Sequence, residues 1–310
     1  PLLTGWQQQI KVDNETAFSQ INKLKVLLGR FDLRSNIMVF FFINSFSLWD
    51  VRQVRALNKW KETNRNKVSD WYHCIATFEV LNSLSTLHYN KPLWCFPQFV
   101  PMHLTFHSVA IGHPLIKEET KVAADFSING TGKIAVVTGS NMAGKSTFLR
   151  SLGCNIILAQ IGAPVSAKNL TLSPVQLMSS MRIADNLAEN TSTFYAELKK
   201  LKSIIEAVNQ HLPLFILLDE ILRGTNSLDR HTGSKALIKQ LLKEKAVAVI
   251  ATHDLDLAKV DTATTGLIEN YHFDAQVDGE ELYFDYKLKA GVCTSLNASI
   301  LMKKIGIELS

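Results

Sequence analysis

The chain has little cysteine and little proline, and its first third has almost no glycine. Its four cysteines form neither a C-x-x-C pair nor a Cys/His cluster at zinc-binding spacing. This argues against a disulfide framework and indicates a reducing, cytoplasmic environment. With 46% hydrophobic and 20% charged residues among 310, the composition is that of a globular protein and excludes disordered and collagen-like chains.

Long hydrophobic runs are also missing. The most apolar stretch, IMVFFFINSFSLW at 37–49, has 13 residues, whereas a membrane-spanning helix needs about 20. We therefore expect a buried core helix there and no membrane, with a membrane segment as the alternative. No signal peptide is recognisable in PLLTGWQQQ, and the absence of an initial Met suggests a piece of a longer protein.

Glycine divides the chain into two parts. Only Gly5 and Gly29 precede Gly112, and apolar residues in this stretch recur at helical spacing. This predicts a mostly helical segment over 1–111. The basic excess lies in the same part, since residues 1–117 hold 13 Lys/Arg against 7 Asp/Glu. A solvated helix face explains that excess, and weak contact with a nucleic-acid backbone is the alternative.

Short apolar runs alternate with longer amphipathic stretches in the second part, 112–310. Three runs, IAVVT at 134–138, LFILL at 214–218 and VAVIA at 247–251, are typical of buried parallel strands. The fold class is therefore α/β with a mainly parallel sheet. A polar cluster follows each run, and the carboxyl ends of parallel strands are where such sheets bind ligands. We expect one site built from all three clusters.

The first cluster, GSNMAGKST, matches the phosphate-loop pattern G-x-x-x-x-G-K-[ST] from Gly139 to Ser146. Gly139 and Gly144 let backbone N–H groups turn toward an anion, and the next helix adds its positive amino end. Lys145 is expected to reach the β- and γ-phosphates of a nucleotide, and Ser146 to ligate Mg²⁺. The sequence therefore predicts a nucleotide-binding site.

The second and third clusters supply candidate catalytic groups. Asp219 is expected in the Mg²⁺ shell, and Glu220 as the group that orients or deprotonates the attacking water. His253 follows the third strand, where it is either a structural residue or a γ-phosphate sensor. Ser192 and Thr193 precede a helical pattern, so they are plain capping residues or a second anion site completing a partner's pocket.

Four strings together resemble the MutS family of mismatch-repair ATPases, which belong to the ABC class. They are GSNMAGKST at 139–147, RIADNLAENTSTFYAEL at 182–198, LLDEILRGTNSLD at 217–229 and ATHD at 251–254. The transporter string L-S-G-G-Q is absent. The resemblance spans about 110–303, with a weaker echo in DGEELYFDYKLKAGVCTSLNAS at 278–299.

The resemblance implies a homodimer with two composite ATP sites, in which each phosphate loop faces the partner's Ser192 and Asp229. It also implies that Asn141, Met142 and Thr147 contact the nucleotide. Ser140 and Ala143 stand where the family usually has Pro and Gly. No adenine-stacking aromatic residue is evident around 121–125, and 117 residues cannot hold the family's mismatch-reading, connector and clamp domains.

The leading hypothesis is therefore a Mg-ATP-hydrolysing domain of a MutS-like DNA repair protein, coupled to DNA bound by the parent protein. The alternative is a nucleotide-gated dimerisation module with negligible turnover and no mismatch recognition. Membrane association through residues 37–49 is a third hypothesis.

Overall fold

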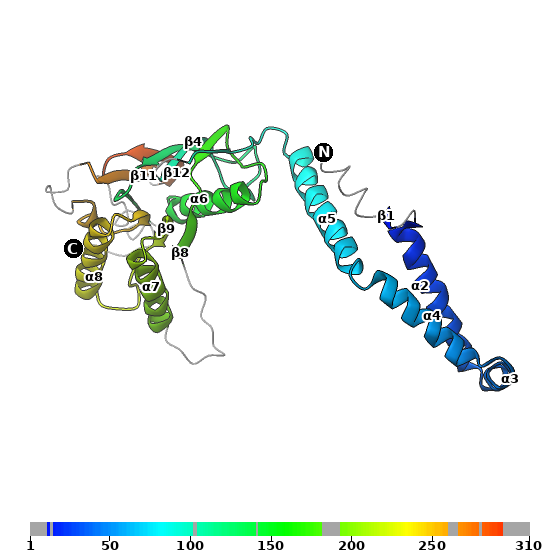
Figure 1. Ribbon diagram of the computed structural model, residues 1–310. Coiled ribbons are helices and arrows are strands. Elements are labelled where there is room, and N and C mark those ends of the chain that lie inside the picture. The colour runs from blue at the N-terminus through cyan, green and yellow to red at the C-terminus, as the bar shows by residue number, and fades with distance from the viewer. Residues whose placement is uncertain are drawn as a thin grey trace. The chain divides into compact units, whose positions relative to one another are not determined.

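The computed structural model describes residues 11–12, 15–101, 104–140, 142–181, 193–259, 266–278 and 281–293 (Figure 1). The chain forms two compact units, Pro1–Thr86 and Leu87–Ser310. The division lies earlier than the boundary at residue 111 that we expected, because residues 98–111 contribute two strands to the second unit. Scarcity of glycine does not separate helices from strands, since both disfavour glycine in their interiors.

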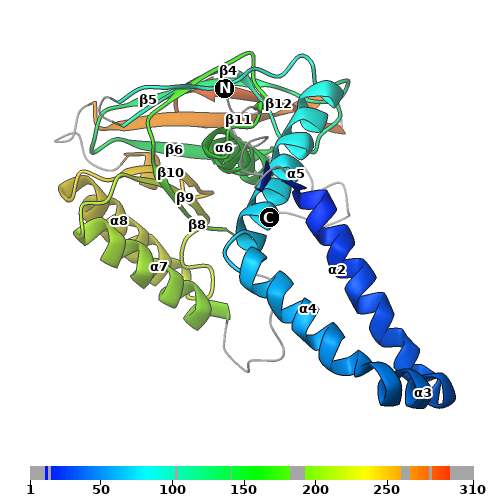
Figure 2. The same ribbon diagram turned by 45° about the vertical axis from the view of Figure 1, so that its right-hand side comes forward.

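The first unit is helical, as its composition indicates (Figure 2). Its elements are β1 (Lys11–Val12), β2 (Glu15–Thr16), α2 (Ala17–Phe31), η1 (Asp32–Ser35), α3 (Ile37–Ser47) and α4 (Trp49–Asn64), followed by α5 (Val68–Asn90), which continues past Thr86. Polar contacts join α2 to α4: the indole N–H of Trp60 donates to the carbonyl oxygen of Gln20 at 2.9 Å, and Asn64 Nδ2 donates to Gln20 Oε1 at 3.2 Å.

The run at 37–49 is helical, but our expectation that it is buried was wrong for the unit that the structure describes. Helix α3 packs on η1 and α4. Apolar side chains elsewhere on it remain in solvent, among them Ile37 at 81% exposure and Phe46 at 88%. A helix at the turn of a helical hairpin has neighbours on one side, so its apolar composition alone cannot bury it. Among the described residues, no helix is long and apolar enough to cross a membrane.

The second unit is built on a six-stranded sheet with the order β12-β11-β6-β10-β9-β8. The strands are β6 (Ile134–Gly139), β8 (Gln176–Ser180), β9 (Leu214–Asp219), β10 (Val247–Ala251), β11 (Ile268–Asp278) and β12 (Glu281–Ala290). All neighbours are parallel except β12, which runs antiparallel to β11. The three predicted strands are confirmed as β6, β9 and β10, and every residue in them is buried.

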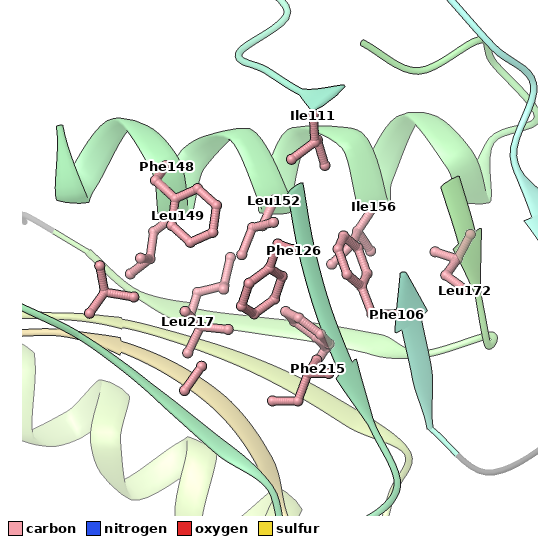
Figure 3. Packing of buried hydrophobic residues seen from close by; sticks show 14 of the residues in the cluster. Phe106, Ile111, Phe126, Phe148, Leu149, Leu152, Ile156, Leu172, Phe215 and Leu217 are labelled. Atoms are coloured by element: carbon pink, nitrogen blue, oxygen red, sulfur yellow. The ribbon is translucent and has the colours of Figure 1, made fainter. Parts of the chain in front are cut away.

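Layers on both faces explain that burial. One face packs against α6 (Lys145–Gln160) and a four-stranded sheet of β3 (Gln98–Phe99), β7 (Asn169–Leu172), β4 (Thr105–Ile111) and β5 (Ala124–Asn129). Figure 3 shows the resulting core, where Phe106 and Phe126 lie with Leu152 of α6 and Phe215 of β9. The other face packs against α7 (Thr193–Asn209), α8 (Ser227–Lys243) and η2 (Leu257–Lys259).

The register of the central strands brings their carboxyl ends to one edge. Ala251 at the end of β10 pairs with Asp219 on one side and with Val137 of β6 on the other. The polar clusters after β6, β9 and β10 therefore converge, as the alternation of runs predicted.

Candidate functional site

The loop between β6 and α6 has a backbone that requires glycine. Gly139 has φ +145°, and a Cβ there would lie 2.7 Å from the carbonyl oxygen of Phe273 on the neighbouring strand. Gly144 has φ +107° and is the N-cap of α6, where no side chain caps the first N–H groups. An uncapped amino end at the mouth of a glycine loop is suited to an anion.

Lys145 is buried inside this loop, with 5% of its surface exposed. Its ammonium donates to the carbonyl oxygens of Gly139 and Ser140, both at 2.8 Å. Burial lowers the pKa of Lys145 to about 8, against the opposing attraction of Glu220 and Asp219. The side chain therefore remains mostly cationic at neutral pH, and its charge lies at the sheet edge where the carboxylates converge.

Asp219 ends β9 as a buried carboxylate, and its Oδ1 has no hydrogen-bond partner among the described residues. Ser146, in the first turn of α6, is half-buried. No group of three His, Cys, Asp or Glu side chains in the described part of the chain could hold a metal. Mg²⁺ bound with a nucleotide does not need such a group, since it takes one or two protein ligands plus water and phosphate oxygens. An unsatisfied carboxylate oxygen fits that role.

Glu220 follows in a left-handed conformation with φ +50°, and its N–H donates to the Ala251 carbonyl at 2.9 Å. Its Oε1 lies 2.5 Å from Nε2 of His253, and its Oε2 lies 2.8 Å from the Arg223 guanidinium. Burial raises the pKa of Glu220, but the hydrogen bond and charge of His253, with Arg223 and Lys145, outweigh it and bring the pKa below its usual value. Glu220 is therefore ionised at neutral pH.

His253 connects the polar clusters of all three strands. Its Nδ1 lies 2.9 Å from the Gly139 carbonyl oxygen and 3.4 Å from the Lys145 ammonium, while Nε2 faces Glu220. The Gly139 carbonyl and the Glu220 carboxylate are both hydrogen-bond acceptors, one facing each ring nitrogen. The imidazole thereby joins the glycine loop to the carboxylate after β9.

The other predicted residues are placed as follows. Met142 is exposed with φ +68°, Ala143 is buried and Thr147 lies exposed on α6. Asp229 is exposed in the first turn of α8, where its N–H donates to the Asn226 side chain at 2.9 Å. Asn141 and Ser192 lie outside the described residues.

A cavity of about 180 Å³ beside the loop was missed by our sequence analysis. Gly144 and Thr147 form one wall, and the aromatic side chains of His113, Phe148, Phe273 and Tyr286 form others. An aromatic residue was expected before the loop, around 121–125. Tyr286 instead comes from β12, which follows the loop in the chain. In the sequence, this residue was indicated only by the string at 278–299, which weakly resembles the family and includes Tyr286.

The second unit also matches known proteins in sequence. A family profile described as MutS domain V matches residues 135–304, more than half of the chain. The chain is 32% identical over 200 residues to DNA mismatch repair protein MutS of Persephonella marina, covering 63% of this chain and 23% of the relative. It is 31% identical over 195 residues to mouse MutS protein homolog 4, covering 60% and 20%.

A third relative is DNA mismatch repair protein MSH3 of Phaeosphaeria nodorum, 30% identical over 230 residues, covering 72% of this chain and 20% of the relative. The chain therefore spans between a fifth and a quarter of the length of these relatives.

The glycine requirement can be tested with Gly139→Ala, using Gly130→Ala as the matched control. Both positions have positive φ, but a Cβ at Gly130 would meet nothing within 4 Å. A left-handed alanine costs about 1–2 kcal/mol, and the backbone clash at Gly139 should add about 1–3 kcal/mol. Urea unfolding followed by circular dichroism measures both losses. Equal losses would show that the contact with Phe273 imposes no constraint.

Proposed function

Because the chain belongs to the MutS family of DNA mismatch repair proteins, we propose that its second unit is a P-loop ATPase domain of the ABC class that binds and hydrolyses Mg-ATP. The observation that carries this proposal is the convergence of Lys145, Asp219, Glu220 and His253 at one edge of a parallel sheet. A cation, a carboxylate with an unsatisfied oxygen and an ionised carboxylate held by histidine are the groups that phosphoryl transfer to water requires.

Binding begins at the glycine loop. The N–H groups of residues 139–147 and the amino end of α6 receive the phosphates, and Asn141 belongs to the same loop in sequence. The Lys145 ammonium exchanges its carbonyl partners for β- and γ-phosphate oxygens. Ser146 and Asp219 would hold Mg²⁺, which would neutralise charge on the β- and γ-phosphates.

Hydrolysis uses the carboxylate of Glu220. The water oxygen forms a bond to the γ-phosphorus, the bond from phosphorus to the bridging oxygen breaks, and its electron pair stays on ADP. Glu220 accepts the water proton, which its ionised state permits. His253, within reach of both Glu220 and the loop, contacts the γ-phosphate and holds the carboxylate in place.

The cavity next to the loop is our candidate for the adenine site. Its position beside Gly144 and Thr147 is where a base would lie when the phosphates occupy the loop. Tyr286 offers an aromatic face for stacking, and Phe148 and Phe273 add apolar walls.

The functional unit that we propose is a homodimer. Each phosphate loop is completed by the partner's Ser192 and by the partner's Asp229, which is exposed at the amino end of α8.

The helical first unit transmits the state of DNA bound by the parent protein. DNA binding by this chain alone should be weak and salt-sensitive, because its basic excess is small. A nucleotide-gated module with negligible turnover is the second candidate.

Removal of the ammonium in Lys145→Ala should lower ATP affinity at least tenfold. Charge-assisted hydrogen bonds to phosphate contribute about 1.5–3 kcal/mol, and none of the neighbouring groups replaces them. Titration calorimetry measures the change, with Lys239→Ala, an exposed lysine on α8, as the control. Unchanged affinity in Lys145→Ala would contradict the assignment of the loop.

Glu220→Gln should retain ATP binding and lose hydrolysis by about 10²–10⁴-fold, because the amide keeps the shape but cannot accept the proton. The trapped ATP should raise the mass of the protein toward a dimer in sedimentation velocity. Glu206→Gln, in an exposed part of α7, should leave both unchanged. Negligible hydrolysis by the unmodified chain, with ATP still raising its mass, would favour the second candidate.

Tyr286→Ala should weaken ATP binding about 5- to 150-fold, since stacking of a base on an aromatic ring contributes about 1–3 kcal/mol. Binding of inorganic tripolyphosphate, which has no base, should not change. Tyr283→Ala on the same strand removes an exposed tyrosine outside the cavity and is the control. An equal loss for ATP and tripolyphosphate would place the base elsewhere.

A further inference from the structure

The loop that carries Glu220 has an unfavourable backbone. Both Glu220, with φ +50°, and Leu222, with φ +58°, are left-handed although neither is glycine. Each such residue costs about 1–2 kcal/mol, so the conformation persists only where surrounding contacts impose it. The Glu220 N–H bond to Ala251 fixes the start of the loop, and another contact is required at Leu222.

Helix α7 provides that contact. Oε1 of Glu197, one turn into the helix, accepts a hydrogen bond from the Leu222 N–H at 2.5 Å. Glu197 is 25 residues from Leu222 in sequence, so this is a tertiary contact and not part of a local turn. A carboxylate that accepts from a backbone N–H forms one of the stronger hydrogen bonds in proteins.

A second contact joins the same helix to the end of the loop. A Cβ at Gly224 would lie 2.5 Å from the Cβ of Phe194, so the backbone there lies directly against the first turn of α7. Between the two contacts lies Arg223, whose guanidinium is 2.8 Å from Oε2 of Glu220. The amino-terminal part of α7 therefore contacts Leu222 and Gly224. These two residues flank Arg223, the ion-pair partner of Glu220.

We propose that Glu197 is a positioning residue for hydrolysis. It holds Leu222 in its left-handed conformation and thereby keeps the Arg223 guanidinium paired with the Glu220 carboxylate. The proposal rests on the role of Glu220 proposed above. Loss of the Glu197 contact lets the loop relax toward right-handed φ values and moves Glu220 away from its aligned pose. The phosphate loop follows another strand, so nucleotide binding is not affected.

The proposal can be tested by comparing Glu197→Ala with Glu197→Gln. Alanine removes the acceptor, whereas the glutamine carbonyl oxygen can accept the same hydrogen bond. We expect kcat to fall about 10- to 100-fold in Glu197→Ala with KM within about twofold, and to recover at least partly in Glu197→Gln. Glu206→Ala is the matched control, since Glu206 lies on the same helix with an exposed side chain, 3.8 Å from Lys202.

Amide hydrogen exchange gives a readout that does not depend on activity. The peptide over residues 220–224 should exchange faster in Glu197→Ala than in the unmodified chain, in Glu197→Gln or in Glu206→Ala. If the unmodified chain does not hydrolyse ATP, the proposed function fails, while the exchange measurement still decides whether Glu197 holds the loop.

Two outcomes would overturn the proposal: unchanged exchange over 220–224 in Glu197→Ala, or unchanged kcat in a chain that hydrolyses ATP. A rise in KM equal to the fall in kcat/KM, with kcat unchanged, would also contradict it, because it would assign Glu197 to binding. If Glu197→Ala does not fold, Glu197→Asp, which is shorter by one methylene, gives the same comparison.

Discussion

The burial of one ammonium group is the constraint on which the site depends. Lys145 lies almost entirely out of water, and an unpaired buried charge is very unfavourable. Two loop carbonyls accept its hydrogen bonds, and the carboxylates after β9 supply the opposing charge. Because those groups come from different strands, the partners of the buried charge are brought together where the strands end at one edge.

The same constraint explains the backbone around it. The carbonyl oxygens can face Lys145 only if the loop turns sharply, which Gly139 permits at a conformation and a distance that no side chain tolerates. On the other strand, Glu220 is turned toward His253 by a left-handed conformation that a non-glycine residue adopts only under external contacts. The unfavourable left-handed backbone at Glu220 and Leu222 is therefore found in the same loop that holds Glu220 beside His253 and Arg223.

The helical first unit shows that an apolar composition predicts a helix but not its burial. The apolar run at 37–49 does form a helix, but composition cannot say which neighbours surround it, and Ile37 and Phe46 remain exposed in the unit that the structure describes. The stretch at 98–111 shows the opposite error, since a glycine-poor segment that we assigned to helices contributes β3 and β4 to the second unit.

Much of the second unit was determined by local sequence. The three strands follow from runs of aliphatic residues that must be buried on both faces, and the phosphate-loop pattern follows from residues adjacent in the chain. The parallel order then places Lys145, Asp219 and His253 at one edge without further information.

Only the tertiary structure decided the contacts between distant residues: the ring of His253 on Glu220, Tyr286 beside Gly144, and Glu197 on the Leu222 amide. Such contacts depend on helix packing and on the register of a hairpin more than a hundred residues downstream of the loop. Periodicity reports which face of an element is buried, but it does not report which side chain of another element lies against it.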